Sequence, residues 1–228
     1  MKTSLLKCMM IALLIGSVSV VFGQKRSEIV KSINEWKNCT NVLITSTKGN
    51  IAVSDKNAYS ISGKFPPAMY DAIVEASKNQ RPVTDMVLTE GGKFLVITGR
   101  NGYVAKGIPE KLDARLKEIN AADGEVISVS FNDNGDWILI ATNAVYADIK
   151  DVKDLKSIAD KNGRILTAHL TNNGIAIVCQ NGVYLYGDFP KVLPETIKQT
   201  TFRIYRVKFA DDGAYFIADK TGSCSFGL

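Results

Sequence analysis

One pattern of about 40 residues recurs five times along this chain. Each unit contains an alternating stretch, a turn that ends in glycine, a wholly apolar stretch, a second turn and a third, short stretch. The glycines of the first turns follow one another at spacings of 43, 43, 39 and 39 residues and are Gly49, Gly92, Gly135, Gly174 and Gly213. Units of this kind bury the faces of their neighbours, so the chain is constrained to an assembly of similar modules.

The three stretches of each unit predict three antiparallel strands. In the first stretch, apolar residues alternate with variable ones such as Ser130, His169 and Lys208, so we expect one buried face and one exposed face. The second stretch is apolar throughout, which predicts a central strand covered on both faces. It covers residues 94–97, 137–140, 175–178 and 215–218. The Asn/Asp-Gly turns supply residues that accept positive φ and favour hairpins.

Short helices are predicted after the third strands. Residues 66–76 and 108–119 have proline near the start and apolar residues at spacings of three and four. Residues 152–159 and 190–200 repeat this pattern. A further helix is predicted over residues 27–38, with no strands before it, and the fifth unit ends without a helix. We therefore expect the N-terminal helix to pack beside the last three strands and to close a ring, which would hide exposed sheet edges.

The predicted fold class is mainly β with short helices: a five-bladed, propeller-like ring of strand–strand–strand–helix repeats. One domain, residues 24–228, would contain the repeats, which span residues 42–80, 83–122, 125–162, 164–200 and 203–228. The strand–turn–strand core around Val129, Gly135 and Trp137 resembles the β-propeller repeats of the WD40 and TolB-like families. The helix in each unit and the missing Trp-Asp ending depart from them. The chain is also similar to the pentein α/β-propellers, which have five units of three strands and a helix, so this alternative stays open.

Residues 1–23 have the composition of a secretory signal peptide. Lys2 and Lys7 lie at the start, residues 9–21 are apolar, and the expected mature N-terminus is Gln24. No other segment is long and apolar enough to span a membrane. We therefore expect an exported bacterial protein, periplasmic or at the cell surface, with no membrane span after removal of the signal peptide.

Charge and motifs favour a binding protein over an enzyme. The formal net charge is +5 for the whole chain and +3 without Lys2 and Lys7, which does not favour nucleic acid as a partner. The sequence has no G-x-S-x-G motif, no Gly-rich phosphate loop and no metal-spaced His/Cys cluster, and its Asp/Asn turns lack the bidentate Glu of a calcium loop. We expect no cofactor, no metal site, and a protein, peptide or carbohydrate ligand.

The pentein resemblance implies a hydrolase alternative that uses a Cys nucleophile with a His partner. His169 is the single histidine, and Cys179 ends the second strand of the same unit. A thiol in a strand that is apolar on both faces is typical of an inert buried residue, and the position of His169 is typical of a partly exposed strand residue. The hydrolase therefore stays an alternative, beside a purely structural subunit of an envelope assembly.

Candidate binding residues lie near the ends of the third strands, where equivalent positions differ from unit to unit. Tyr184, Tyr186 and Phe189 make the fourth unit aromatic, which suits the stacking of a sugar or peptide. Arg100 and Lys106 in the second unit suit an anionic ligand. The competing interpretations are packing between units for the aromatic residues and simple solvation for the two cations.

Cys39 and Cys224 lie in the two elements that ring closure would bring together. Cys39 ends the N-terminal helix, and Cys224 lies in the last strand. The three cysteines that remain after signal removal allow at most one internal disulfide. In an exported protein, Cys39 and Cys224 are the candidate pair for it.

Overall fold

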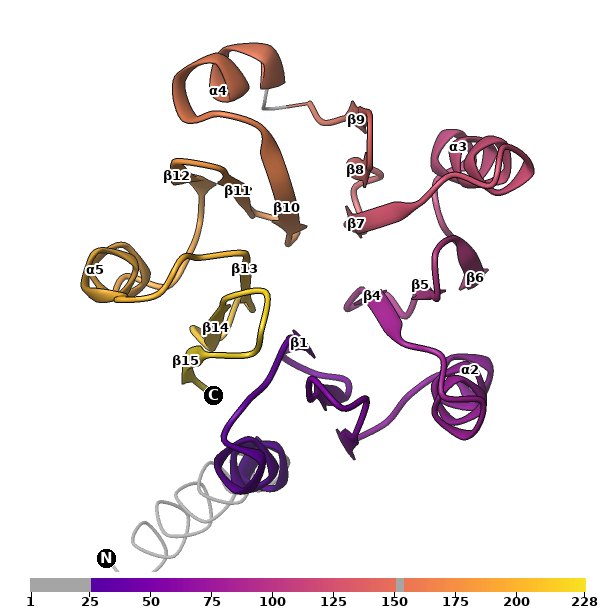
Figure 1. Ribbon diagram of the computed structural model, residues 1–228, viewed down its shortest axis with the longest axis vertical. Coiled ribbons are helices and arrows are strands. Elements are labelled where there is room, and N and C mark those ends of the chain that lie inside the picture. The colour runs from indigo at the N-terminus through magenta and orange to yellow at the C-terminus, as the bar shows by residue number, and fades with distance from the viewer. Residues whose placement is uncertain (1–25, 151–153) are drawn as a thin grey trace, which may run out of the picture.

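The computed structural model describes residues 26–150 and 154–228, and the predicted signal peptide lies outside these residues. The described chain contains fifteen strands, in five separate three-stranded sheets, and five helical segments. Figure 1 shows the sheets arranged around one axis with the helices at the periphery. This is a mainly β, propeller-like arrangement of five similar units. Among the described helices, none has the length and apolarity that crossing a membrane requires.

Each sheet is formed by three strands that follow one another in the chain. The first sheet contains β1 (Asn41–Leu43), β2 (Asn50–Val53) and β3 (Tyr59–Ser62). The second contains β4 (Val83–Leu88), β5 (Phe94–Thr98) and β6 (Gly102–Lys106), and the third β7 (Val126–Phe131), β8 (Trp137–Ala141) and β9 (Val145–Asp148). The fourth contains β10 (Ile165–Leu170), β11 (Gly174–Cys179) and β12 (Gly182–Gly187). The fifth contains β13 (Arg206–Phe209), β14 (Tyr215–Ala218) and β15 (Cys224–Gly227).

The first strand of each sheet lies nearest the axis (Figure 1). These strands contact one another from sheet to sheet, and β1 contacts both β4 and β13. We name them the inner strands: β1, β4, β7, β10 and β13. The pairing of the first with the second strand shifts register near the start of β4, β7 and β10. Such a bulge re-aims the side chains next to it.

Apolar clusters fill the space between successive sheets. The second strand of a sheet contributes side chains to two of these clusters, because successive side chains of a strand point to opposite faces. In β5, Phe94 and Val96 pack with the first sheet, whereas Leu95 and Ile97 pack with the third. This two-sided burial confirms the predicted central strand. A further cluster joins Phe216 of the fifth sheet to β1 and β2 of the first.

The prediction of an exposed face on the inner strands is wrong. Lys208 is 3% exposed and Ser130 1%, Val87 is also buried, and His169 is half-buried. The residues opposite the apolar face meet those of other inner strands at the axis, where Lys208 contacts Asp85 of β4. These positions are polar because the side chains bond side-chain or backbone groups of other inner strands, not because water covers them.

The four predicted helices between the sheets are present. They are α2 (Pro67–Lys78), α3 (Glu110–Ala121), α4 (Leu155–Asn162) and α5 (Leu193–Gln199). Pro66 and Pro109 occupy the N-cap positions of α2 and α3. In α4, the carboxylate of Asp154 caps the first turn by accepting a hydrogen bond from the Ser157 amide at 2.9 Å. The predicted start of this helix at residue 152 lies outside the described residues.

The N-terminal helix, of which residues 26–36 are described, packs against the last sheet as predicted. Ile29 and Ile33 are buried in the cluster that contains Phe216 of β14. Just after the helix, the backbone amide of Cys39 donates to the Gly222 carbonyl at 2.8 Å. The helix therefore occupies the place beside the fifth sheet that the other units fill with a helix of their own.

Four of the five turn glycines are required for one of two different physical reasons. Three of them have φ between 86° and 92°, as the turn chemistry predicts, and these are Gly92, Gly135 and Gly213. Gly174 does not have positive φ, and a Cβ atom there would approach the Asp188 carbonyl oxygen to 1.8 Å. The glycine of the fourth unit is therefore explained by close backbone packing rather than by turn conformation.

Candidate functional site

Charged residues of the inner strands meet at the axis. Asp85 of β4 is completely buried, and Arg206 Nη1 and Lys208 Nζ of β13 lie 3.0 and 3.1 Å from its Oδ1 atom. The side chains of Arg206 and Lys208 are only 6% and 3% exposed. Two basic side chains therefore share one buried carboxylate.

Asp85 also connects further inner strands. Its Oδ2 atom accepts hydrogen bonds from the Ser128 hydroxyl at 2.8 Å and the Val129 amide at 3.0 Å, both in β7. Asn41 of β1 donates from Nδ2 to Oδ1 at 3.2 Å. One buried carboxylate thereby joins β1, β4, β7 and β13. Buried donors that lose such an acceptor are destabilising, so the cluster fixes how these strands meet.

The cluster determines the ionisation of its members. Burial by itself raises the pKa of Asp85, but the charges of Lys208 and Arg206 outweigh burial and hold this pKa well below its ordinary value. The Val129 amide and the Ser128 hydroxyl act in the same direction. Burial lowers the pKa of Lys208, and the charge of Asp85 opposes this shift. Asp85 is therefore ionised at neutral pH.

Among the pockets of the described residues, two lie at opposite ends of the inner strands. One, which we name the basic pocket, is lined by the N-terminal ends of these strands, and Arg206 reaches it. The other, the turn pocket, is lined by their C-terminal ends and the turns that follow, and Lys208 reaches it. Because both cations bind Asp85, this carboxylate lies between the two pockets.

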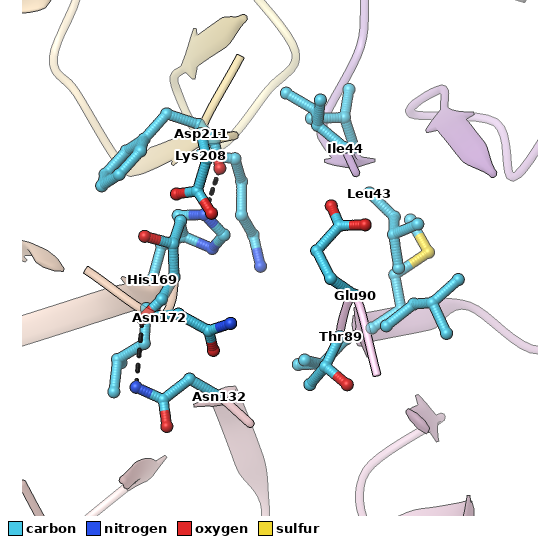
Figure 2. Close-up of a pocket in the computed structure, with 16 residues that line it drawn as sticks. Leu43, Ile44, Thr89, Glu90, Asn132, His169, Asn172, Lys208 and Asp211 are labelled. Carbon is cyan, nitrogen blue, oxygen red and sulfur yellow. Dashed lines mark hydrogen bonds between the residues drawn. The ribbon is translucent and has the colours of Figure 1, made fainter. Parts of the chain in front are cut away.

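Figure 2 shows the turn pocket, in which Glu90 and Lys208 project inward from opposite sides. Its other labelled polar residues are Thr89, Asn132, His169, Asn172 and Asp211. The cavity volume is ≈ 50 Å³. Ligand pockets for organic molecules usually measure about 300–1,000 Å³, whereas a water molecule occupies about 30 Å³ of liquid. The turn pocket therefore suits water rather than an organic ligand.

Hydrogen bonds between successive turns hold the walls of the turn pocket. Glu90 accepts from the Thr47 amide at 3.1 Å and so ties the second unit to the first. Asp133 Oδ2 accepts from the Gly91 amide at 2.9 Å, and Asn172 Oδ1 accepts from the Asp133 amide at 2.9 Å. The turns of the first three units are thus each bonded by a side chain of the next unit.

His169 of β10 is a neutral member of the turn pocket. Its Nε2 atom lies 2.6 Å from the Phe209 carbonyl oxygen, so Nε2 carries the hydrogen and donates it. The two rings also make an edge-on contact, with centroids 5.0 Å apart. Burial, followed by the charge of Lys208, lowers the pKa of His169 to about 3. His169 is therefore a hydrogen-bond donor between β10 and β13 and does not change charge near neutral pH.

The basic pocket is larger, with a cavity volume of ≈ 450 Å³. All five inner strands contribute residues to the basic pocket, and residues just before these strands also line it. Its charged lining residues are Arg164, Arg206, Lys220 and Glu125. The Glu125 carboxylate accepts a hydrogen bond from the Thr142 hydroxyl at 3.2 Å. The volume falls within the range of small-molecule sites, and cations outnumber carboxylates in the lining by three to one.

The Cys179–His169 pair of the hydrolase alternative is not formed. Cys179 pairs with Ile165 at one end of β10, whereas His169 pairs with Ala176 near the other end. Cys179 packs in the cluster toward the third sheet, while His169 contacts Phe209 of the fifth sheet. The two side chains thus face opposite sides of the same sheet, and burial raises the pKa of the Cys179 thiol. The two residues are close in sequence, but successive side chains of a strand point to opposite faces of the sheet. Closeness in sequence therefore did not bring the two side chains together.

The three candidate aromatic residues are not gathered in one place. Tyr184 packs between the third and fourth sheets, and Phe189 packs between the fourth and fifth. Phe189 also lines a surface hollow of ≈ 330 Å³. Tyr186 is 44% exposed on the outer strand β12. Packing between units accounts for two of the three residues, and their role in binding stays a prediction.

The two candidate cations of the second unit lie on its outer side. Arg100 pairs with Asp123 at 3.1 Å, and both side chains are well exposed. Lys106 is exposed at the end of β6. Neither residue lines the basic pocket or the turn pocket. Their role in binding an anion also stays a prediction.

Cys39 and Cys224 lie in one apolar cluster between the N-terminal helix and the fifth sheet. Both are free thiols in the structure, and the Cys224 thiol lies against the backbone of Cys39. Burial raises the pKa of Cys39 to about 12 and also raises the pKa of Cys224. The predicted closeness of the two elements is present, and the disulfide stays a prediction.

The sequence analysis missed the axial cluster, although the repeat contains a signal for it. Asp85, Ser128, Thr167 and Arg206 each lie seven residues before the turn glycine of their unit. Equivalent positions of the inner strands meet at the axis of a ring, so an acid and a base in this register would be neighbours. The sequence analysis expected this face of the inner strands to be exposed to solvent, and for that reason it did not connect Asp85 with Arg206.

No protein-family model matches the chain, and a search of curated proteins also finds no match. Among solved structures, the chain is similar to one described as a streptogramin B lyase structure. The sequences are 12% identical, the match covers 83% of this chain and 69% of that chain, and the TM-score is 0.26. A likeness of this size supports no inference, so the propeller-like description rests on the strand pairing and packing given above.

Proposed function

We propose that this chain forms an exported, closed, five-unit propeller-like domain over residues 24–228 that acts as a non-catalytic binding module. The observation that carries the proposal is the basic pocket, to which residues of all five inner strands contribute. They include Asn41, Thr84, Val126, Leu166 and Arg206. The position of a site shared in this way is fixed by several units at once. Pre-organisation of this kind favours binding, because little freedom is lost when the ligand enters.

Contacts between the fifth and first units support closure. Arg26 of the N-terminal helix donates from Nη2 to Asp212 Oδ2 at 2.6 Å and to the Thr45 carbonyl at 2.8 Å. Asp212 lies in the first turn of the fifth unit, and Thr45 lies in that of the first unit. The apolar cluster that holds Phe216 spans the same junction. One side chain and one cluster therefore link the two ends of the array.

The chemistry of the lining supports a non-catalytic role. Among the described residues, no histidine or cysteine lines the basic pocket. His169, the single histidine of the chain, lies at the opposite end of the axis and donates to a backbone carbonyl. Nucleophilic catalysis needs an activated nucleophile with a base in hydrogen-bond reach. Arginine and lysine side chains, by contrast, are suited to holding a ligand.

A titration with a mixed fragment set, followed by backbone amide chemical shifts of the purified protein, tests this proposal. We expect binding fragments to shift amides around Thr84, Val126 and Leu166. Shifts confined to the rim around Tyr186 would contradict an axial site. In a parallel assay with peptide, ester and guanidine substrates, the protein and its Cys179→Ala variant should show no hydrolysis. Hydrolysis that the Cys179→Ala change abolishes would contradict the non-catalytic role.

Export is a separate part of the proposal and rests on the composition of residues 1–23. Expressed with its own N-terminus in a bacterial host, the protein is expected in the periplasmic or extracellular fraction. Its intact mass there should correspond to a chain that begins at Gln24. Recovery of the uncleaved chain from the cytoplasm alone would contradict the proposed export and leave the axial site unaffected.

A further inference from the structure

Cations gather around the basic pocket from the fourth and fifth units. Arg164 lies just before β10, Arg206 opens β13, and Lys220 follows β14. Glu125 is the one carboxylate among the described lining residues, and its Oε2 atom accepts from Thr142. The lining thus carries three positive charges against one negative charge. Such a concave, positively charged surface attracts anions.

Arg206 adds a second and independent observation. This residue is 5% exposed, and Nη1 binds Asp85 at 3.0 Å while Nη2 lies 3.4 Å from the Thr84 carbonyl. The remaining nitrogen, Nε, is buried and has no hydrogen-bond partner among the described residues. A buried donor without an acceptor is costly, and guanidinium groups are suited to binding two oxygens of one acid group. Arg206 therefore has unused donor capacity in the lining of the pocket.

The interior beneath the pocket strengthens this preference. Asp85 is shared by Arg206 and Lys208, so the axial cluster contains one carboxylate and two basic side chains. His169 adds no negative charge to this cluster. Charges in a low-dielectric interior interact more strongly than charges in water. An anion in the basic pocket would therefore interact favourably with the buried guanidinium of Arg206.

The remaining walls indicate that the anion has an apolar part. The apolar residues of the lining are Pro82, Val83, Val126, Ile127 and Leu166. Tyr205 also lines the pocket, and its ring lies 6.0 Å from both Arg206 Cζ and Lys220 Nζ. The tyrosine thus holds two of the cations near one another. The volume of ≈ 450 Å³ exceeds what a bare inorganic anion needs.

We propose that the basic pocket binds a small organic anion, with its carboxylate or phosphate group held by Arg164, Arg206 and Lys220 and its apolar part against Leu166 and Tyr205. The inference rests on the proposed binding function and names the ligand class for that same site. Arg206 is the buried anchor, because Asp85 and the Thr84 carbonyl already fix its guanidinium. Arg164 and Lys220 are exposed at the mouth and would attract the anion and close around it.

The test compares phenyl phosphate, benzoate and the neutral benzyl alcohol by amide shift titration of the purified protein. We expect saturable shifts around Thr84, Val126 and Leu166 with at least one of the two anions, and weaker binding as salt concentration rises. The double variant Arg164→Gln/Lys220→Gln should bind that anion about tenfold more weakly. Both residues are exposed, so this variant should keep its fold. Lys64→Gln removes an exposed cation elsewhere and should leave binding unchanged.

The outcomes separate the ligand class from the binding function. Binding of phenyl phosphate alone or of benzoate alone would support the proposal and identify the acid group. If benzyl alcohol binds as well as the anions, or if the double variant binds the anions unchanged, the anion proposal is overturned while an axial binding site stands. If no probe, neutral or charged, shifts amides of the basic pocket at saturating concentration, the anion proposal and the axial binding function both fail.

Discussion

The carboxylate of Asp85 lies 3.0 Å from the guanidinium of Arg206, although 121 residues separate them in the chain. Asp85 lies in β4 and Arg206 in β13, which belong to the second and fifth units. Only the arrangement of the sheets around one axis brings the two together. The contact between Asp85 and Arg206 therefore depends on how the five units assemble rather than on the fold of any single unit.

Replacement of Asp85 by asparagine should destabilise the protein strongly. Asp85→Asn keeps the shape of the side chain but leaves Arg206 and Lys208 buried without a counter-charge. Breaking a buried ion pair from one side usually costs about 3–5 kcal/mol. Urea unfolding of the variant should show a loss of this size. Asp55→Asn, at an exposed loop carboxylate, is the control and should change stability by about 0.5 kcal/mol or less. A similar small change in Asp85→Asn would contradict the axial cluster.

His169 should give stability a pH dependence that no other side chain supplies. Its pKa is about 3 in the folded protein, against about 6.5 for an unfolded chain. The unfolded state therefore takes up the proton first, and stability is lost as pH falls below 6.5. One such group lowers the free energy of unfolding by about 2 kcal/mol between pH 7 and pH 5. Carboxylates of the unfolded chain contribute mainly below that window.

The control for this pH dependence is His169→Gln, whose amide can still donate to the Phe209 carbonyl. Because the chain has one histidine, this variant should have nearly constant stability between pH 7 and pH 5. Urea unfolding at several pH values measures both proteins. Equal slopes in the two proteins would show that folding does not lower the pKa of His169.

The ion pair of Arg26 with Asp212 should contribute measurably to the junction of the first and fifth units. The two atoms lie 2.6 Å apart, and the side chains are 14% and 33% exposed. A partly exposed pair of this kind is expected to contribute about 0.5–1 kcal/mol of coupling. A double-mutant cycle of Arg26→Ala and Asp212→Ala by urea unfolding measures it. Lys31→Ala in the same helix, whose partner Glu35 is 3.8 Å away and highly exposed, should have little effect. Zero coupling in the cycle would contradict this contribution.

Cys39 and Cys224 are expected to form a disulfide when the protein folds under oxidising conditions. Burial raises the pKa of both thiols, so exchange should be slow once the protein is folded and faster during refolding. Refolding with oxidised glutathione should yield a protein with one alkylatable cysteine, Cys179, and a stability gain of about 2–4 kcal/mol. Cys39→Ser should lose the gain, and Cys179→Ser should keep it. Three alkylatable cysteines after oxidative refolding would rule the bond out.

The repeat made much of the fold predictable, because burial between units imposes one period on every unit. The central strands such as residues 94–97 are apolar throughout since each face packs on a different neighbour. The N-terminal helix was predictable for the same reason: Ile29 and Ile33 supply the apolar stripe that the fifth unit lacks. The central strands and the N-terminal helix depend only on the spacing of apolar residues, and this spacing can be read from the sequence.

The axial site was not predicted, because its polarity is satisfied by residues far apart in sequence. A lysine such as Lys208 in an alternating strand gives the same sequence pattern whether its side chain is exposed to water or paired with a buried carboxylate. Only the arrangement of the inner strands around one axis distinguishes the two, since it brings Asp85 to Lys208 across 123 residues. The candidate rim residues Tyr184 and Phe189 failed to gather for a related reason: aromatic side chains at strand ends also fill the spaces between sheets.

A crystal structure of the purified protein grown with phenyl phosphate would show whether the basic pocket binds an anion. We predict that the phosphate lies in the basic pocket within hydrogen-bond distance of Arg206 and of Arg164 or Lys220, with the ring against Leu166. A basic pocket empty of the probe at saturating concentration, or a probe bound only at the rim beside Tyr186, would contradict an anion-binding site at the axis.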